Sequence, residues 1–214
     1  MSEDVWSKRA QLYRESAAHR EGPDLDLLVE WVEETGAKTA LDVATGGGHV
    51  ARRLREVGAT VVTTDAAPGM QPDVITRAEH LPFADGSFDA VVSRVAHHHF
   101  DDPAAATKEM ARVSGGLVVV VDNLFMDDSA EEADRLRDPS HVRNYTEAEW
   151  RAMFDGAGLE VEAVEHFDKP IEFQPWLDRV GCEGEDAERV RELLADRIED
   201  GWVSLERIAL KGVK

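Results

Sequence analysis

The residues best suited to chemistry are carboxylates and imidazoles that stand beside a glycine-rich segment or at the ends of apolar runs. Residues 39–54 read TALDVATGGGHVARRL, so an apolar run, three glycines and an amphipathic pattern follow one another. This order predicts a buried strand, a tight turn and a helix. Glycine has no Cβ, so the backbone can approach a ligand closely, and the helix start behind it offers unpaired N–H groups. The segment therefore predicts a ligand-binding loop, with Asp42 just before it.

Two classes of ligand fit this loop. The stretch from Gly46 to Ala51 matches the pattern G-x-G-x-x-A of dinucleotide-binding folds, which indicates an NAD(P)-dependent oxidoreductase. Asp42 favours another ligand, because a carboxylate is of no use to a pyrophosphate but suits an aminoacyl group that carries a sulfonium. Asp65 closes the next β-branched run, at the distance where an acidic residue binds the ribose hydroxyls of a nucleotide.

A second segment distinguishes the two classes. Residues 77–89 read RAEHLPFADGSFD. Together with residues 39–54, they resemble the motifs of class I S-adenosylmethionine (SAM)-dependent methyltransferases, in particular the ubiquinone/menaquinone C-methyltransferase branch (methyltransferase type 11 domain). Dinucleotide dehydrogenases lack this second motif. The resemblance implies a SAM-dependent methyltransferase that acts by in-line displacement, without a metal. An NAD(P)-dependent oxidoreductase and a non-catalytic SAM-binding protein are the two alternatives.

The resemblance also implies which residues bind the cofactor. Met70 stands where the family packs a side chain on the adenine. Arg77 replaces the family's Asp, and a guanidinium cannot accept a hydrogen bond from the adenine amino group. Either Glu79 or the backbone of Ala78 then takes that contact. The implied cofactor residues are Asp42, Ala44, Thr45, Gly46, Gly48, Asp65, Ala66, Met70, Ala78, Glu79, Ser93 and Arg94.

Three adjacent histidines, residues 97–99, follow a predicted strand. Consecutive side chains project in different directions, whereas metal sites draw ligands from spaced positions, so no metal site is predicted. His98 and His99 match the family's H-H-F, and His97 is an addition. An imidazole titrates near neutral pH and can remove a proton from an acceptor, which makes His98 and His141 the candidate bases. Alternatively, the histidines only shape the pocket.

The acceptor site is expected to combine an N-terminal helix with the polar segment 137–143, RDPSHVR. In the resembled family the N-terminal helix folds over the mouth of the cofactor site. Tyr13 then contacts a ligand, or else it is a core aromatic residue. The arginines of segment 137–143 either bind an anionic substrate or cap the next helix. The implied acceptor residues are Tyr13, His99, Asn123, Arg137 and Arg143.

Hydrophobic periodicity indicates alternating helices and strands along the 214 residues. Strands are expected at 39–44, 59–64, 73–76, 90–93, 117–121, 159–167 and 203–213, and helices at 4–18, 23–34, 49–57, 102–113, 131–136, 146–155, 173–180 and 185–198, with a turn at 114–116. The resemblance implies a doubly wound, Rossmann-like α/β sheet of about seven strands in the order 3-2-1-4-5-7-6. Its last strand is antiparallel, and N-terminal helices and a helical cap complete one domain: a lid (1–36), a cofactor core (37–123) and a cap that completes the sheet (124–214).

The overall composition of the chain limits the classes of partner that it is expected to bind. A net charge of −20 argues against a nucleic-acid substrate, because phosphates require basic surface. A single cysteine, Cys182, excludes an intramolecular disulfide, and with no signal peptide evident it favours a cytoplasmic protein. The longest aliphatic run, 117–121, is too short to cross a membrane. The expected partner is a small-molecule methyl acceptor, and the oligomeric state is open, a homodimer included.

Overall fold

One mixed sheet forms the centre of the computed structural model, which describes residues 3–214; residues 1 and 2, part of the predicted lid, lie outside the described residues. The strands are β1 (Thr39–Val43), β2 (Thr60–Asp65), β3 (Val74–Ile75), β4 (Phe88–Arg94), β5 (Ser114–Asn123), β6 (Glu160–Glu172), β7 (Ile198–Glu199) and β8 (Trp202–Val213). Their order is β3-β2-β1-β4-β5-β8-β6, and β8 runs antiparallel to both neighbours. The predicted order is confirmed, with β8 in the place of the predicted seventh strand, because the two-residue β7 lies off this path and pairs only with β8.

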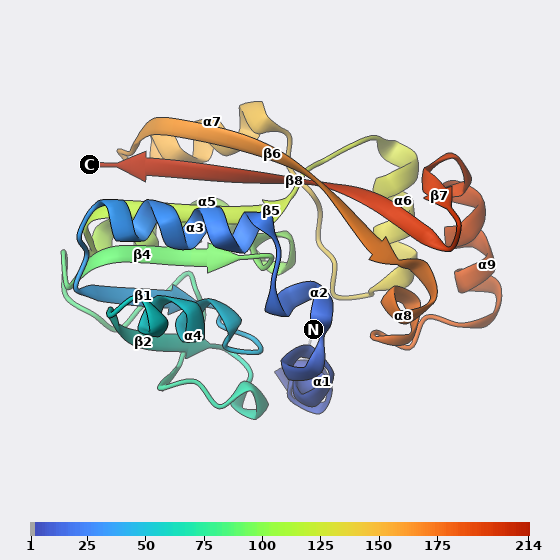
Figure 1. The fold of residues 1–214 in the computed structure, drawn as a ribbon, viewed down its shortest axis with the longest axis horizontal. Coiled ribbons are helices and arrows are strands. Elements are labelled where there is room, and N and C mark those ends of the chain that lie inside the picture. Colours follow the sequence, from blue (N-terminus) through green and yellow to red (C-terminus); the bar gives the residue numbers. More distant parts are fainter. Residues whose placement is uncertain (1–2) are drawn as a thin grey trace.

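Helices cover both faces of the sheet (Figure 1). On one face lie α3 (Pro23–Glu34) and α4 (His49–Glu56), and on the other lie α5 (Pro103–Val113) and α7 (Glu147–Gly156). Each face has its own apolar core: Leu28 and Leu54 belong to the first, and Trp150 and Phe154 to the second. Thr146 and Glu149 form the capping box that starts α7. Because β1, β2, β4 and β5 are parallel, their carboxyl ends meet at one edge of the sheet.

Two local predictions were wrong. The expected turn at 114–116 is the first part of β5, because Ser114 pairs with Phe88 directly after α5. Gly115 fits there because a Cβ would lie 3.3 Å from the carbonyl oxygen of Phe88. The helix expected at 185–198 ends earlier, and β7 pairs with β8 across a two-residue turn. Asp200 (φ 49°) and Gly201 (φ 82°) form that turn, and the Asp-Gly pair is a hairpin signal present in the sequence.

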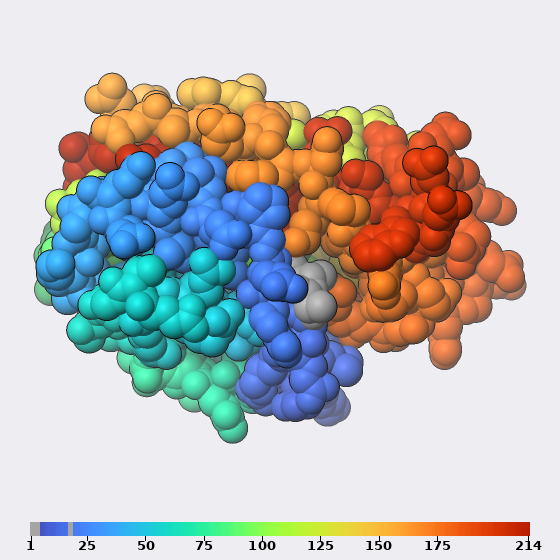
Figure 2. Space-filling model, in the orientation of Figure 1, coloured from blue at the N-terminus to red at the C-terminus, as the bar shows by residue number. Residues whose placement is uncertain are grey.

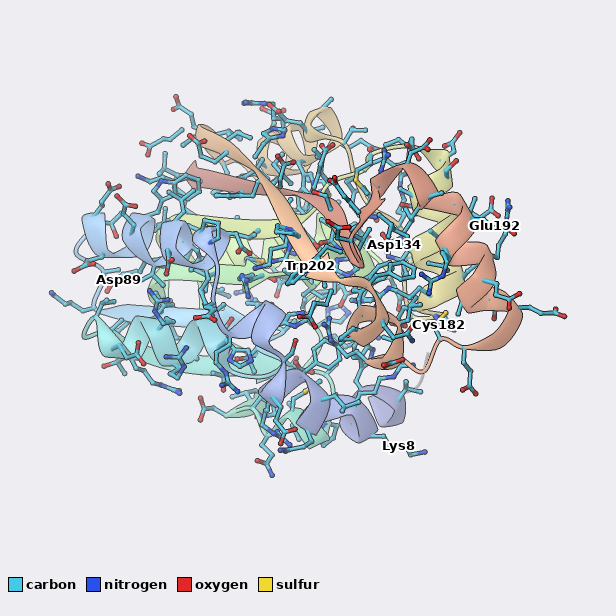
Figure 3. All side chains as sticks on the ribbon, turned by 45° about the vertical axis from the view of Figure 1, so that its right-hand side comes forward. Lys8, Asp89, Asp134, Cys182, Glu192 and Trp202 are labelled. Atoms are coloured by element: carbon cyan, nitrogen blue, oxygen red, sulfur yellow. The ribbon has the colours of Figure 1, made fainter. Side chains whose placement is uncertain are left out.

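A cap stands beyond the carboxyl ends of the strands. It contains α6 (Asp128–Arg137), α8 (Phe173–Asp178), α9 (Gly184–Leu193), η3 (Ala195–Arg197) and β7. Figure 1 shows β6 and β8 reaching out of the sheet into this cap. The cap has its own apolar core around Trp176, Leu177 and Val190. Figure 3 labels Asp134, a buried residue of α6 within the cap, whereas the side chain of Glu192 on α9 projects outward.

The N-terminal helices link the sheet to the cap. Residues expected as one helix form α1 (Glu3–Glu15) and α2 (Ala17–Arg20), with Ser16 between them. Ser7 Oγ accepts a hydrogen bond from the backbone N–H of Gly69 (3.0 Å), in η1 (Pro68–Met70). Arg9 Nη2 donates to the carbonyl of Val180 in the cap (2.7 Å). Helix α1 therefore bridges the two parts, as the dark blue atoms show at the lower edge of Figure 2. None of the helices that the structure describes is long and apolar enough to cross a membrane.

Candidate active site

A cavity of about 290 Å³ lies at the carboxyl ends of β1, β2 and β4, under helix α1. This is where open parallel sheets bind ligands. The predicted site residues that line it are Tyr13, Ala44, Thr45, Gly46, Asp65, Ala66, Met70, Ala78, Glu79, Arg94, His99 and His141. The predicted residues outside its lining are Asp42, Gly48, Ser93, His98, Asn123, Arg137 and Arg143.

The glycine-rich loop forms one wall of this cavity. Gly46 and Gly48 have φ values of +52° and +77°, which glycine adopts without strain. A Cβ on Gly47 would lie 2.8 Å from the carbonyl oxygen of Tyr13, so a side chain there would displace α1. His49 Nε2 donates to that same carbonyl (3.0 Å). The loop and the N-terminal helix therefore fit together only with glycine at position 47.

Two residues that are not glycine also have left-handed backbones here. Ala44 (φ 56°) follows β1 and Val95 (φ 57°) follows β4, and both line the cavity. A positive φ is costly for a β-branched residue, and such strain collects at functional sites. The sequence did not identify Val95, because nothing in the residue type signals this conformation.

Asp42 lies behind the loop and is 1 % exposed. Its Oδ2 accepts hydrogen bonds from Thr45 Oγ1 (2.6 Å) and from the backbone N–H of Ala51 (3.1 Å). Burial raises the pKa of Asp42 to about 6. In this arrangement Asp42 ties the loop to α4, and its direct contact with a cofactor stays a prediction.

Asp65 stands at the end of β2 and lines the cavity. Its Oδ2 accepts from the backbone N–H of Gly46 (3.0 Å), and its Oδ1 accepts from that of Ala67 (2.9 Å). Burial raises the pKa of this carboxyl. The carboxylate is therefore fixed next to the loop, where two ribose hydroxyls could donate to its remaining lone pairs.

The adenine end of the cavity differs from the resembled family. Arg77 Nη2 lies 2.6 Å from Asp101 Oδ2 and 3.3 Å from Glu79 Oε1. All three residues line the cavity. The charge of Arg77 is thus neutralised by two carboxylates. Glu79, with a side chain only 9 % exposed, is the acidic group left next to the backbone of Ala78.

The opposite wall contains His99 of η2 (His97–His99), and His98 lies behind the lining. His98 Nδ1 lies 2.5 Å from Asp122 Oδ1, and the His98 backbone N–H donates to Asp122 Oδ2 (3.1 Å). Burial opposes the charged form of His98, but Asp122 outweighs it and raises the pKa of His98. The imidazole in turn holds the pKa of the buried Asp122 at about 2. The pair forms an oriented His–Asp dyad whose His98 side chain is 5 % exposed.

His99 and His141 complete this wall. His99 Nδ1 lies 3.1 Å from the carbonyl oxygen of Ser140. A carbonyl only accepts, so Nδ1 carries the proton and Nε2 has the lone pair. His141 Nε2 is held by Glu131 Oε1 (3.1 Å). The ring of His98 lies 4.0 Å from that of His99 and 5.6 Å from that of His141, measured between centroids. The three imidazoles therefore form one cluster.

Other polar residues near the cavity take part in packing and ion pairs. His97 is fully buried against Phe100 and Trp150, and burial lowers its pKa to about 4. Arg143 pairs with Glu149 of α7 (2.7 Å), which is the helix-capping role considered for that segment. Ser93 lies fully buried within β4. Among the described residues, no cluster of three or more His, Cys, Asp or Glu side chains is arranged for a metal ion.

A buried group of charges that the sequence did not reveal adjoins the cavity. Arg94 Nε donates to Asp24 Oδ2 (2.9 Å), and Arg207 Nη1 donates to the same oxygen (2.8 Å). Arg94 lines the cavity, and Asp24 and Arg207 lie behind it. Asp24 and Arg207 come from α3 and β8, so no local pattern could have identified the pair.

Known proteins share this arrangement. A family model described as "Methyltransferase domain" matches residues 41–120. The chain is 32% identical over 202 residues to the uncharacterized methyltransferase YcgJ of Bacillus subtilis (strain 168), a match that covers 84% of this chain and 80% of YcgJ. The crystal structure of YcgJ gives a TM-score of 0.80 at 27% identity and covers 89% of this chain and 97% of that one.

Two further relatives point the same way. The structure of BH2331 from Bacillus halodurans C-125 gives a TM-score of 0.79 at 30% identity and covers 90% of this chain and 99% of that one. A demethylmenaquinone methyltransferase of Renibacterium salmoninarum is 35% identical over 108 residues, which cover 45% of this chain and 46% of that protein.

The sheet order, the antiparallel β8 and the cavity at the glycine-rich loop define the class I methyltransferase fold. The chain belongs to the SAM-dependent methyltransferase family. The predicted family, enzyme class and cofactor are confirmed, and the oxidoreductase alternative is wrong.

Proposed function

We propose that this methyltransferase transfers the methyl group of SAM to a small-molecule acceptor by in-line displacement. One observation carries the proposal: a single cavity has the glycine-rich loop and Asp65 on one side and the imidazole of His99 on the other. A cofactor on the first side and an acceptor on the second would be held as neighbours. Such positioning is the main contribution an enzyme makes to a displacement reaction.

The residues on the cofactor side fit SAM. The close approach of Gly47 to α1 leaves a loop with backbone groups at the cavity wall, and Asp65 is fixed for the ribose. The adenine would lie between Met70 and the segment of Ala78 and Glu79. SAM supplies a methyl group on a sulfonium, so the departing sulfur is neutral. In this scheme residues 1–36 act as the lid, 37–123 as the cofactor core and 124–214 as the acceptor cap.

In this proposal the imidazole cluster removes a proton from the acceptor. An acceptor with an acidic O–H, N–H or C–H becomes a better nucleophile when a base removes that proton. His98 is the proposed base, because Asp122 orients its ring and stabilises the imidazolium once the proton has been taken. His99 and His141 line the cavity beside it and would contact the acceptor.

The size and charge of the molecule favour a small acceptor. Helix α1 covers the cavity, which leaves little room for a polymer. A net charge of −20 also opposes nucleic acid. Methyltransferases that act on carbon, oxygen and nitrogen acceptors share this fold.

Calorimetric titration with S-adenosylhomocysteine (SAH), with NADH as the control, tests the cofactor side first. We expect micromolar binding of SAH and no binding of NADH. Transfer of labelled methyl from SAM to a panel of small phenols, enols and amines then tests catalysis. SAH binding without turnover on any acceptor would favour a non-catalytic SAM-binding protein.

The variant His98→Ala tests the proposed base. We expect lower turnover with unchanged SAH affinity, because the dyad lies on the acceptor side. An equal loss of turnover and SAH affinity would mean that His98 only shapes the pocket.

A further inference from the structure

A chain of hydrogen bonds stands behind His99, which lines the cavity. His99 Nδ1 lies 3.1 Å from the carbonyl oxygen of Ser140 and 3.2 Å from Oγ of the same residue. Ser140 Oγ in turn donates to Asp138 Oδ1 (2.7 Å). Asp138 and Ser140 belong to the segment between α6 and α7, so this loop holds the imidazole from outside the cavity.

The carboxylate of Asp138 sets the direction of these hydrogen bonds. Asp138 is 1 % exposed, and burial opposes its charge. Hydrogen bonds from the hydroxyl and the backbone N–H of Ser140 outweigh burial and hold the pKa of Asp138 at about 2. An ionised carboxylate only accepts, so the Ser140 hydroxyl must donate to it and can only accept from His99. The proton of the His99 imidazole is therefore on Nδ1.

The second nitrogen of His99 keeps its lone pair. Among the described residues, Nε2 has no hydrogen-bond partner, so it is free to accept from a ligand in the cavity. Burial lowers the pKa of His99 well below 6.5, and His98, with its ring centroid 4.0 Å away, lowers it further. Two imidazoles this close disfavour a second positive charge, so His99 stays neutral when His98 takes a proton.

Helix α1 supports the same chain of hydrogen bonds. Arg9 Nη1 donates to Asp138 Oδ1 (3.2 Å), the oxygen that also accepts from Ser140. The Trp6 ring packs edge to face with the His99 ring, with 4.7 Å between the centroids. Helix α1 therefore contacts His99 directly through Trp6 and acts on it indirectly through Arg9.

We propose that His99 Nε2 accepts a hydrogen bond from a neutral hydroxyl or N–H group of the methyl acceptor. Asp138 and Ser140 are positioning residues that keep the imidazole proton on Nδ1, and Arg9 of α1 holds Asp138 in place. The inference rests on the proposed function and narrows the acceptor to a molecule with a neutral hydrogen-bond donor. A carboxylate would face the lone pair without a proton to donate.

The test uses the protein saturated with SAH and two probes of similar shape, phenol and toluene, of which only phenol can donate. NMR titration gives the ratio of phenol affinity to toluene affinity, in which the difference in hydration between the probes cancels when variants are compared. His99→Phe keeps a planar ring without an acceptor, so this ratio should fall about five- to tenfold, equivalent to one hydrogen bond.

The outcomes separate the inference from the proposed function. A protein that binds SAH but shows the same ratio in His99→Phe, or does not bind phenol at all, overturns the inference and leaves the proposed function intact. Failure to bind SAH overturns the proposed function itself.

Nitrogen-15 NMR of histidine-labelled protein tests the positioning residues. The His99 signals, assigned by their loss in His99→Phe, should show the proton on Nδ1 at neutral pH. Asp138→Asn should raise the fraction with the proton on Nε2, because an amide can donate to Ser140 Oγ and turn the hydroxyl proton toward His99. The phenol-to-toluene ratio should fall with it, about two- to fivefold. A purely structural role would weaken both probes alike and leave the tautomer unchanged, which would contradict the inference.

Matched controls separate these effects from a general change of charge. Arg9→Gln should lower the ratio about two- to fivefold, whereas Lys8→Gln makes the same charge change at an exposed position of α1 and should keep the native ratio. Asp155→Asn, at an exposed position of α7, is the control for Asp138→Asn and should keep the native tautomer. Equal effects in test and control variants would overturn the assignment of Arg9 and Asp138.

Discussion

The two ends of the cavity are built in different ways. The proposed cofactor end consists of loops that directly follow β1, β2 and β3 within residues 44–79, and its lining includes backbone groups and the carboxylates of Asp65 and Glu79. The proposed acceptor end combines side chains from α1, η2 and the segment at Ser140 and His141. The first end is assembled locally and the second from distant segments, so they should respond differently to mutation.

Their charges differ as well. The cofactor end is acidic, and Arg77 there is neutralised by two carboxylates. The proposed acceptor end contains imidazoles, and next to the cavity Asp24 is shared among Arg94, Arg207 and Lys169. Asp24 lies behind the cavity, where it pairs with Arg94, which lines the cavity, and with Arg207 of β8, the strand that enters the cap.

The largest effect is expected from Asp24→Ala, which removes the buried carboxylate between Arg94 and Arg207. Breaking a buried ion pair costs about 3–5 kcal/mol, because the remaining charges stay uncompensated. Urea denaturation would measure the loss in the free energy of unfolding. Asp26→Ala on the same helix is the control: its side chain is 62 % exposed and pairs with Arg53, so the loss should stay below about 1 kcal/mol. Equal losses would contradict the special role of Asp24.

The same carboxylate predicts a pH dependence. Burial opposes ionisation of Asp24, but Arg207 and Arg94 outweigh it and lower its pKa below 3.8. Its contribution to stability is therefore present above pH 3.8 and is lost as the pH falls through the lowered pKa. The difference in unfolding free energy between the native protein and Asp24→Ala should shrink in acid.

Asp122→Asn should change catalysis and leave the cofactor end intact. We expect turnover to fall about 100-fold, the scale of general base catalysis, with SAH affinity changed less than about twofold. Native turnover should rise with pH above 6.5, as His98 loses its proton at its raised pKa. The midpoint should move to lower pH in Asp122→Asn, because the carboxylate that raises the pKa is gone. An unshifted pH profile would exclude His98 as the titrating base.

The stability that protonated His98 contributes falls as the pH rises, whereas turnover is expected to increase. Protonated His98 is favoured in the folded state, so its contribution to stability is fully present below pH 6.5 and is lost as the pH rises through the raised pKa. For Asp122, with a pKa of about 2, the contribution is present above pH 3.8 and is lost in strong acid. Thermal denaturation across this pH range would measure both.

Asp65→Asn should affect the cofactor end alone. The loss of a charged acceptor for ribose hydroxyls should weaken SAH binding about 10- to 100-fold, equivalent to about 1.5–3 kcal/mol. Calorimetry would measure this loss, with Asp155→Asn at an exposed position of α7 as the control. The pH midpoint of turnover should not move. A moved midpoint would show that the two ends of the cavity are not independent.

The smallest effect is expected from Arg77→Ala. The Arg77 side chain is 46 % exposed and its ion pairs are solvent-screened, so SAH affinity should change less than about threefold. Titration with SAH provides the test. A change above about tenfold would mean that Arg77 itself contacts the adenine.

The parts of the fold and site that could be predicted depend on neighbours in sequence. Strand β1, the loop at Gly46 and Asp65 follow from short patterns, as does the capping box at Thr146. The segment 114–116 was misjudged because helix α5 leads into β5 without a turn, and pairing with β4 decides that. The early end of α9 carried a local sign, the Asp-Gly pair at 200–201, which was missed.

The sequence by itself determined the family, the cofactor class and the carboxylates next to the loop, because those features arise from residues a few positions apart. It did not distinguish the roles of the three adjacent histidines. Tertiary structure decided that His97 packs among aromatic rings, that His98 meets Asp122 and that His99 meets Ser140.

The pairing of the buried charges also depends on tertiary structure. Asp24 meets Arg94 from 70 positions away and Arg207 from 183 positions away. Only the packing of α3, β4 and β8 brings these groups together. The interaction energy of a charged group depends on its burial and on its neighbours in space. Neither can be predicted from a local sequence pattern.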